Sequence, residues 1–171
     1  MNRNRTSLVH IIAVMLLLII GGCGTYSFTG ASIPPGTESV SVSFFENRAS
    51  IIQPTLSSTF TEKLKDRFVS QTNLRLVTAK GDLQFEGYIS DYQSRPVAIQ
   101  GNEQAALNRL TITVSVNFKN EKDPKQNFDS SFSRYVDYDS RKNLSTVEQE
   151  LISEICQQLT EDIFNKAVIN W

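Results

Sequence analysis

Apolar and polar residues alternate with a period of two in several stretches of the chain. The clearest lies at 110–118, where Leu, Ile, Val, Val and Phe take every second position and Thr, Thr, Ser and Asn lie between them. Such alternation, with β-branched and aromatic residues, predicts a strand with one buried face. Four further stretches have the same character: 38–45, 74–77, 83–92 and 128–138.

The details of these stretches lead to three expectations. In the stretch 38–45, we expect one set of alternate residues to face the core: Val40, Val42 and Phe44. The stretches 110–118 and 128–138 are expected to form a hairpin around a charged loop at 121–125. The segment 94–104 contains proline, glycine and polar residues, and is expected to be a long loop.

Two other stretches have the spacing of amphipathic helices. The first begins near Pro54 and stops near Thr72, and its apolar residues lie four apart: Leu56, Phe60, Leu64 and Phe68. A membrane-surface helix is the alternative, but its mixed charges favour packing on a core. The second runs to about Lys166 with a longer apolar stripe: Val147, Leu151, Ile155, Leu159 and Ile163. Its start at Ser145–Glu148 fits a capping box, in which the glutamate bonds back to the serine N–H.

The elements follow in the order strand, helix, four strands, helix. Two amphipathic helices and one sheet with a polar face predict an α/β (α+β) fold. We expect a two-layer sandwich, with the helices packed on one mixed or antiparallel sheet of four to five strands. The polar strand faces carry serine and threonine rather than charge. They suit either plain hydration or hydrogen bonding to a partner.

The first 22 residues have the character of an export signal. Arg3 and Arg5 precede ten consecutive apolar residues, which as a helix would rise only about 15 Å, half of a bilayer core. Ile20-Gly21-Gly22-Cys23 then resembles the lipobox of bacterial lipoproteins, whose cysteine is acylated and becomes the mature N-terminus. The sequence thus predicts a lipoprotein signal peptide at 1–22, a lipidated N-terminus and tether at 23–37, and a single domain at 38–171.

Acylation of Cys23 would hold the mature chain on a membrane by lipid alone. The alternative is an ordinary secreted protein with a chance cysteine. An Asp at the second mature position often retains a lipoprotein at the inner membrane, and none is present here. We therefore expect a lipid-anchored protein on the periplasmic side of the outer membrane.

Composition removes most catalytic chemistry. The one histidine, His10, lies in the signal peptide, which leaves no histidine for Ser-His-Asp or Cys-His catalysis or for most zinc sites. Cys156 lies within a helical apolar stripe and is expected to be a buried structural residue. Asp137 and Asp139 share a strand face and are expected to be solvated acids, with a cation site as the alternative. The sequence predicts no enzyme, metal or cofactor, and a net charge of −1 predicts no nucleic-acid partner.

Three segments carry a family resemblance. They are Cys23–Gly30 after the lipobox, Val40–Phe45 with the following Glu46-Asn47-Arg48-Ala49, and the terminal Ile163–Trp171. They resemble the LptE family, the lipopolysaccharide-assembly lipoproteins of the Gram-negative outer membrane. The first segment looks like the Cys-Gly-Tyr opening of that family, with an extra Thr25 here. The resemblance implies two helices on a four- or five-stranded sheet and no catalysis.

The resemblance also implies partners. LptE-like proteins plug the lumen of the large β-barrel LptD, help it assemble, bind lipopolysaccharide and help deliver it to the outer leaflet. Basic residues are then the candidates for contacts with lipid phosphates: Arg95, Arg109, Lys119, Lys122 and Lys125. Two alternatives stay open. One is a lipoprotein scaffold of another envelope complex, and the other is a lipid-anchored hydrolase that uses Cys156 or a carboxylate pair, which the residue inventory disfavours.

Overall fold

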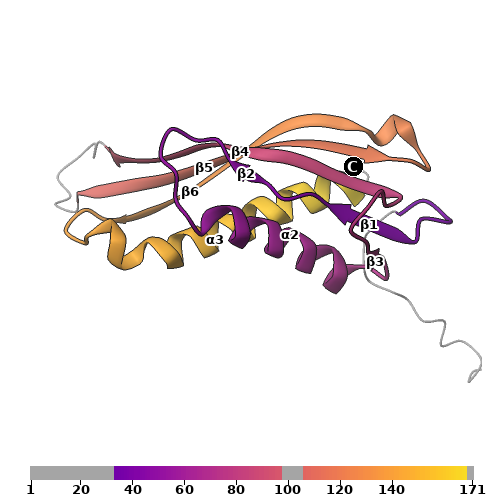
Figure 1. Ribbon diagram of the computed structural model, residues 1–171. Helices are drawn as coiled ribbons and strands as arrows, with labels where there is room; N and C mark the ends of the chain where they lie inside the picture. Colours follow the sequence, from indigo (N-terminus) through magenta and orange to yellow (C-terminus); the bar gives the residue numbers. More distant parts are fainter. Residues whose placement is uncertain (1–32, 98–105, 169–171) are drawn as a thin grey trace, which may run out of the picture. The chain divides into compact units, whose positions relative to one another are not determined.

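The structure is a computed structural model that describes residues 33–97 and 106–168. In these residues two helices lie on one face of a six-stranded sheet, and no helix covers the other face (Figure 1). The elements are β1 (Ser39–Val42), β2 (Glu46–Asn47), α2 (Leu56–Gln71), β3 (Arg75–Leu76), β4 (Leu83–Val97), β5 (Leu107–Asn120), the 3₁₀ helix η2 (Pro124–Gln126), β6 (Phe128–Asp139) and α3 (Leu144–Val168). The expected two-layer sandwich is confirmed.

The sheet is mixed, with the strand order β3-β1-β4-β5-β6, and β2 also pairs with β4. β1 runs parallel to β3 and β4, whereas β4, β5 and β6 are antiparallel. β5 and β6 form the expected hairpin, in register from Leu107 opposite Asp139 to Phe118 opposite Phe128. The strand count exceeds the expected four to five because β2, a strand of two residues after β1, is an additional element.

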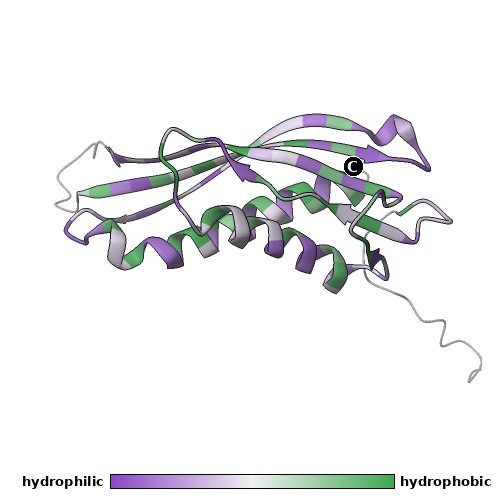
Figure 2. Cartoon of the chain, in the orientation of Figure 1, coloured by the Kyte–Doolittle hydropathy of each residue, from purple (hydrophilic) through white to green (hydrophobic). Residues whose placement is uncertain are grey.

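A row of phenylalanine rings crosses the covered face of the sheet. Phe118 of β5 lies between Phe85 of β4 and Phe128 of β6, with ring centroids 4.7 and 5.1 Å apart. Phe68 of α2 extends the row, its centroid 4.6 Å from that of Phe85. Apolar and polar residues alternate along the long strands in Figure 2, as the period of two requires.

The two helices run in the same direction beneath the sheet. Near their N-terminal ends the Thr55 hydroxyl donates to the side-chain oxygen of Gln149 at 3.1 Å. Further along, the Arg67 guanidinium donates to the backbone carbonyl of Gln157. The stripe Leu56, Phe60, Leu64 and Phe68 is fully buried. The first helix therefore packs on the core, as its charge pattern favours.

The first strand breaks earlier than its alternation predicts. β1 ends two residues before Phe44, which is 60% exposed, whereas Phe45 is fully buried. The Phe45 ring packs edge-on against Phe60 at 5.0 Å. It fills the space above Gly87, where an added Cβ would lie 2.6 Å from that ring and 2.0 Å from a backbone oxygen of β5. The prediction that Phe44 faces the core is wrong. Gly87 has no side chain, and the ring of Phe45 rather than Phe44 packs into the space above it.

The long strands extend further than the loop signals predict. β4 continues to Val97 and β5 begins at Leu107, so 94–97 is strand rather than loop. Pro96 is tolerated because this end of β4 has a neighbouring strand on only one side within the described residues. The rest of the predicted loop, 98–104, lies outside the described residues.

The capping box expected at the start of α3 is not formed. Asn143 caps the helix, and its side-chain oxygen accepts from the N–H and the hydroxyl of Ser145 at 3.1 and 3.0 Å. The Glu148 carboxylate instead accepts a hydrogen bond from the hydroxyl of buried Tyr92. The prediction is wrong because Glu148 turns toward the sheet, where its bond ties the first turn of α3 to β4.

Candidate functional site

The face of the sheet that no helix covers is rich in hydroxyl groups. It is formed by the alternate residues of β4, β5 and β6 that point away from the core, which include Gln93, Thr111, Thr113, Ser115, Asn117, Ser131, Ser133 and Tyr135. We call this surface the open face. The Thr113 and Ser133 hydroxyls lie 3.0 Å apart and bond to each other across the strands. Glu86 and Asp91 of β4 and Asp129 of β6 lie on the same face. The expected Ser- and Thr-rich surface is present on β5 and β6 and remains accessible.

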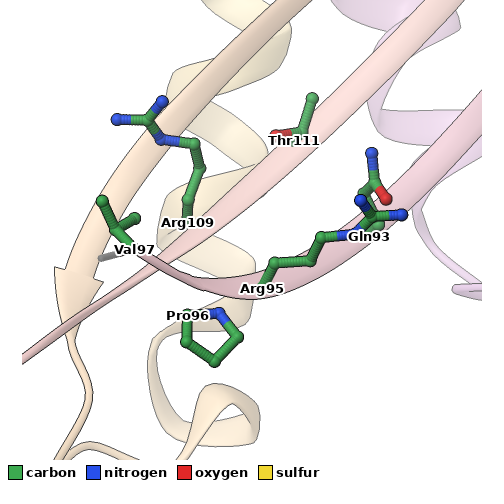
Figure 3. A pocket seen from close by; sticks show the side chains of 6 residues that line it. All are labelled: Gln93, Arg95, Pro96, Val97, Arg109 and Thr111. Atoms are coloured by element: carbon green, nitrogen blue, oxygen red, sulfur yellow. The ribbon is translucent and has the colours of Figure 1, made fainter.

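A shallow pocket of about 200 Å³ lies on the open face at one end of β4 and β5. Its lining is mixed in character and comes from both strands: Gln93, Arg95, Pro96, Val97, Arg109 and Thr111. Arg95 and Arg109 are direct partners in the strand register. In Figure 3 their guanidinium groups turn away from each other, and Arg95 extends toward Gln93. Two cations therefore flank one pocket.

Arg109 is held by two groups of β6. Its Nε and Nη2 donate to the two carboxylate oxygens of Asp137 at 2.7 and 2.9 Å. The Tyr135 ring lies beneath the guanidinium, with 3.6 Å between the ring centroid and Cζ. The bidentate bond lowers the pKa of Asp137 and raises that of Arg109. The pair stays ionised at neutral pH.

Arg95 is the less constrained cation of the pocket. It is exposed, and it makes no ion pair with any residue in the described part of the chain. Like charges directly opposite each other in a sheet repel. Because Asp137 compensates Arg109 alone, the row Arg95–Arg109–Asp137 carries one uncompensated positive charge. The pocket is therefore suited to an anion.

The five basic residues singled out in the sequence do not form one site. Arg95 and Arg109 meet at the pocket, whereas Lys119, Lys122 and Lys125 lie toward the other end of β5. Ten residues of strand separate Arg109 from Lys119, or about 33 Å. Lys122 is also paired with Asp82, 3.2 Å away. The structure therefore supports two of the five as members of a common site.

The other residues considered for catalysis or metal binding, Asp137, Asp139 and Cys156, are either paired with arginine or buried. Asp139 is held by Arg141, so it and Asp137 each have an arginine of their own. Across 33–97 and 106–168, no three His, Cys, Asp or Glu side chains gather as a metal site needs. Cys156 is fully buried, and burial raises the pKa of its thiol to about 12. A thiol in that environment is inert.

Sequence reasoning missed the two β6 residues that hold Arg109 in place, Asp137 and Tyr135. The local pattern relates Asp137 only to Asp139, because its partner Arg109 lies 28 residues earlier in the chain. Pairing the two strands of the predicted hairpin around its loop is the signal that could have found them, since Arg109 and Asp137 are direct partners.

The predicted signal peptide, Cys23 and most of the tether lie outside the described residues. Ile33, near the end of that tether, packs against the core. None of the helices in the described part is both long enough and apolar enough to cross a bilayer.

Comparisons with known proteins identify relatives. The family model LptE, described as lipopolysaccharide-assembly, matches residues 37–167. No curated protein sequence matches the chain. A minor lipoprotein of Acinetobacter baumannii has a similar structure, with a TM-score of 0.51 and 15% identity over 76% of this chain and 91% of that one. A hypothetical protein of Chlamydia trachomatis gives a TM-score of 0.53 and 8% identity over 78% and 99%. At these identities the structures show a shared fold.

Proposed function

Because the chain belongs to the LptE family of lipopolysaccharide-assembly proteins, we propose that it plugs and helps assemble a large LptD-like β-barrel of the outer membrane. In this role it assists the delivery of lipopolysaccharide to the outer leaflet. It acts by binding and positioning, without catalysis. It is an envelope lipoprotein, anchored through an acylated Cys23 on the periplasmic side of the outer membrane.

The observation that carries the proposal is the chemistry of the open face. A barrel lumen is polar, so a plug must meet it with groups that hydrogen bond. The open face offers Thr111, Thr113 and Ser115 along one strand, all half-exposed. Hydroxyls cost much less to remove from water than ions do, provided that they find hydrogen-bond partners. A hydroxyl-rich face therefore suits burial against a polar wall.

The size of the domain sets the size of the barrel. A compact chain of about 149 residues has a radius of gyration near 15 Å. Barrels of 16–18 strands enclose an aqueous channel, and the diameter grows with strand number. Enclosing most of this domain requires a barrel well beyond that size. The pocket with Arg95 and Arg109 is then the candidate for contacts with lipid phosphates, with Lys119, Lys122 and Lys125 outside it.

Photocrosslinking tests the proposal at the open face. Crosslinkers placed singly at Thr111, Thr113 and Ser115 in the full chain should capture the inner wall of a large outer-membrane barrel in cells. A crosslinker at Glu154, exposed on the helix layer, is the comparison position. Capture of another envelope protein from the open face, or equal capture from Glu154, would count against the proposed contact. Depletion of the protein should also reduce barrel assembly and surface lipopolysaccharide.

The lipid anchor has its own test. Labelled palmitate should enter the wild-type chain and not Cys23→Ser, because the thiol is the acyl acceptor. Label that persists in the variant would overturn the assignment of Cys23.

A further inference from the structure

Three charged residues lie in one row across the open face. Arg95 of β4 is the register partner of Arg109 of β5, which in turn is the partner of Asp137 of β6. The row therefore holds two cations beside one anion at the edge of the pocket. Only Arg109 is in contact with the carboxylate. The protein itself thus provides an anion for Arg109, one of the residues that line the pocket.

Asp137 occupies one of the two edges of Arg109 that could hold an anionic ligand. The Nε–Nη2 edge, the fork that Asp137 holds, is one of two edges of the guanidinium that match a carboxylate or a phosphate with two parallel bonds. Both of its N–H groups already donate to Asp137, at 2.7 and 2.9 Å. The Tyr135 ring covers one flat side of the guanidinium. A ligand must therefore either displace the carboxylate or bind to the edge of the guanidinium that includes Nη1.

We propose that Asp137 is an internal competitor that makes this pocket select phosphomonoesters over phosphodiesters. The proposal rests on the proposed function, since it assumes that phosphate groups of a glycolipid reach the pocket. A phosphodiester brings a single charge, the same as the carboxylate that it would have to displace. A phosphomonoester carries about −1.5 to −2 at neutral pH and has three terminal oxygens, so it brings more charge to Arg109 than the carboxylate does.

Attachment to the same sheet strengthens the competitor. Asp137 is always present beside Arg109, so a free ligand competes against a high effective concentration. The Arg109 guanidinium also holds the pKa of Asp137 below its ordinary value, which keeps the carboxylate ionised in the periplasmic pH range. Displacement by a more highly charged ligand is then the route by which the fork of Arg109 becomes available.

β6 supplies a matched control two residues away. Asp139 lies on the same face of the same strand, and it too is paired with an arginine, Arg141. That arginine is not part of the pocket lining. Asp139→Asn removes the same charge from the same face and leaves the fork of Arg109 occupied. It separates competition at Arg109 from a general change of electrostatic potential.

The experiment measures binding of two short-chain lipids with the same acyl chains. They differ in whether the phosphate is a monoester or is esterified with a second glycerol. The full chain is purified in a non-ionic detergent and titrated with dihexanoyl phosphatidic acid, a monoester, and dihexanoyl phosphatidylglycerol, a diester. Wild type should bind the monoester more tightly. Asp137→Asn should bind the diester roughly fivefold more tightly and the monoester less so, and the ratio between the two should fall roughly threefold. Asp139→Asn should keep the wild-type ratio.

The outcomes separate this inference from the function on which it rests. An unchanged ratio in Asp137→Asn, or the same fall in Asp139→Asn, overturns the role of Asp137 while lipid binding stands. Binding of neither lipid by wild type or by Asp137→Asn overturns the phosphate site as well, whereas crosslinking to a barrel tests the plug separately. Inorganic phosphate is the third ligand. If inorganic phosphate binds as tightly as phosphatidic acid, the site binds a free anion and not specifically a lipid headgroup. That result overturns the assignment of the pocket to a glycolipid phosphate.

Discussion

The two faces of β5 have opposite chemistry on one backbone. Leu110, Ile112, Val114 and Val116 point toward the helices and are fully buried. The residues between them, from Thr111 to Asn117, point away and are half-exposed. Because successive strand side chains alternate between faces, the hydrophobic free energy of this strand comes from one set of positions. The other set is free to change without loss of the core.

The open face differs from a surface made only for water. Solvated surfaces are commonly rich in lysine and glutamate, whereas the centre of this face carries Thr113, Ser115, Ser131 and Ser133. Ions placed there would oppose docking, because stripping water from a charge costs several kcal/mol. One charged residue, Asp91 of β4, lies beside this centre as the register partner of Thr113. The other charges lie toward the ends of the strands, and the pocket is at one of these ends. The core and the proposed recognition surface therefore lie on opposite faces of the same strands.

The largest expected effect is on the covered face. Phe118→Ala removes the central ring of the phenylalanine row and leaves a cavity between Phe85 and Phe128. The free energy of unfolding should fall by about 3–5 kcal/mol. Lys119→Ala, the next residue on the same strand and exposed on the open face, should change it by less than about 0.5 kcal/mol. Urea unfolding measures both, and similar losses would show that the two faces share the stability.

Periodicity was sufficient to predict much of the fold. The alternation at 110–118 predicts β5, and the stripe from Leu56 to Phe68 predicts α2, because both patterns reflect a single buried face. The two-layer arrangement follows from these elements. Chain order also predicts the hairpin of β5 and β6, since a short charged loop separates two strands of similar length.

Features that depend on register or on a single close contact were not predictable from the pattern. Phe44 and Phe45 are both aromatic, and which of them is buried depends on the space above Gly87, a distant residue. Glu148 fits a local capping motif, yet its partner is Tyr92, 56 residues away. The ion pair beside the pocket joins Arg109 to Asp137, 28 residues away. Local patterns carry no information about which distant residue lies opposite.

A smaller effect is expected for the polar bond on the covered face. Tyr92→Phe removes the hydroxyl that donates to Glu148 and should lower the free energy of unfolding by about 1–2 kcal/mol at pH 7. Burial, then the bond to Glu148, raises the pKa of Tyr92 above its ordinary value near 10. A raised folded-state pKa contributes stability that is present below pH 10 and lost as the pH rises further. The difference between wild type and Tyr92→Phe should therefore shrink above pH 10 in urea titrations, and a difference that grows there would contradict the assignment.

The smallest effect on stability is expected at the centre of the open face, where the effect on recognition should be largest. Thr113→Val keeps the β-branched shape and removes the hydroxyl that bonds to Ser133, so the free energy of unfolding should change by less than about 0.5 kcal/mol. Recovery of the barrel with the tagged full chain should nevertheless fall, because a lumen-wall group loses its partner and a buried unpaired polar group is costly. Thr146→Val makes the same chemical change at an exposed position on α3 and should leave recovery unchanged. A loss of stability in Thr113→Val comparable to that of Tyr92→Phe would mean that the open face supports the fold, and the division between the two faces of β5 would fail.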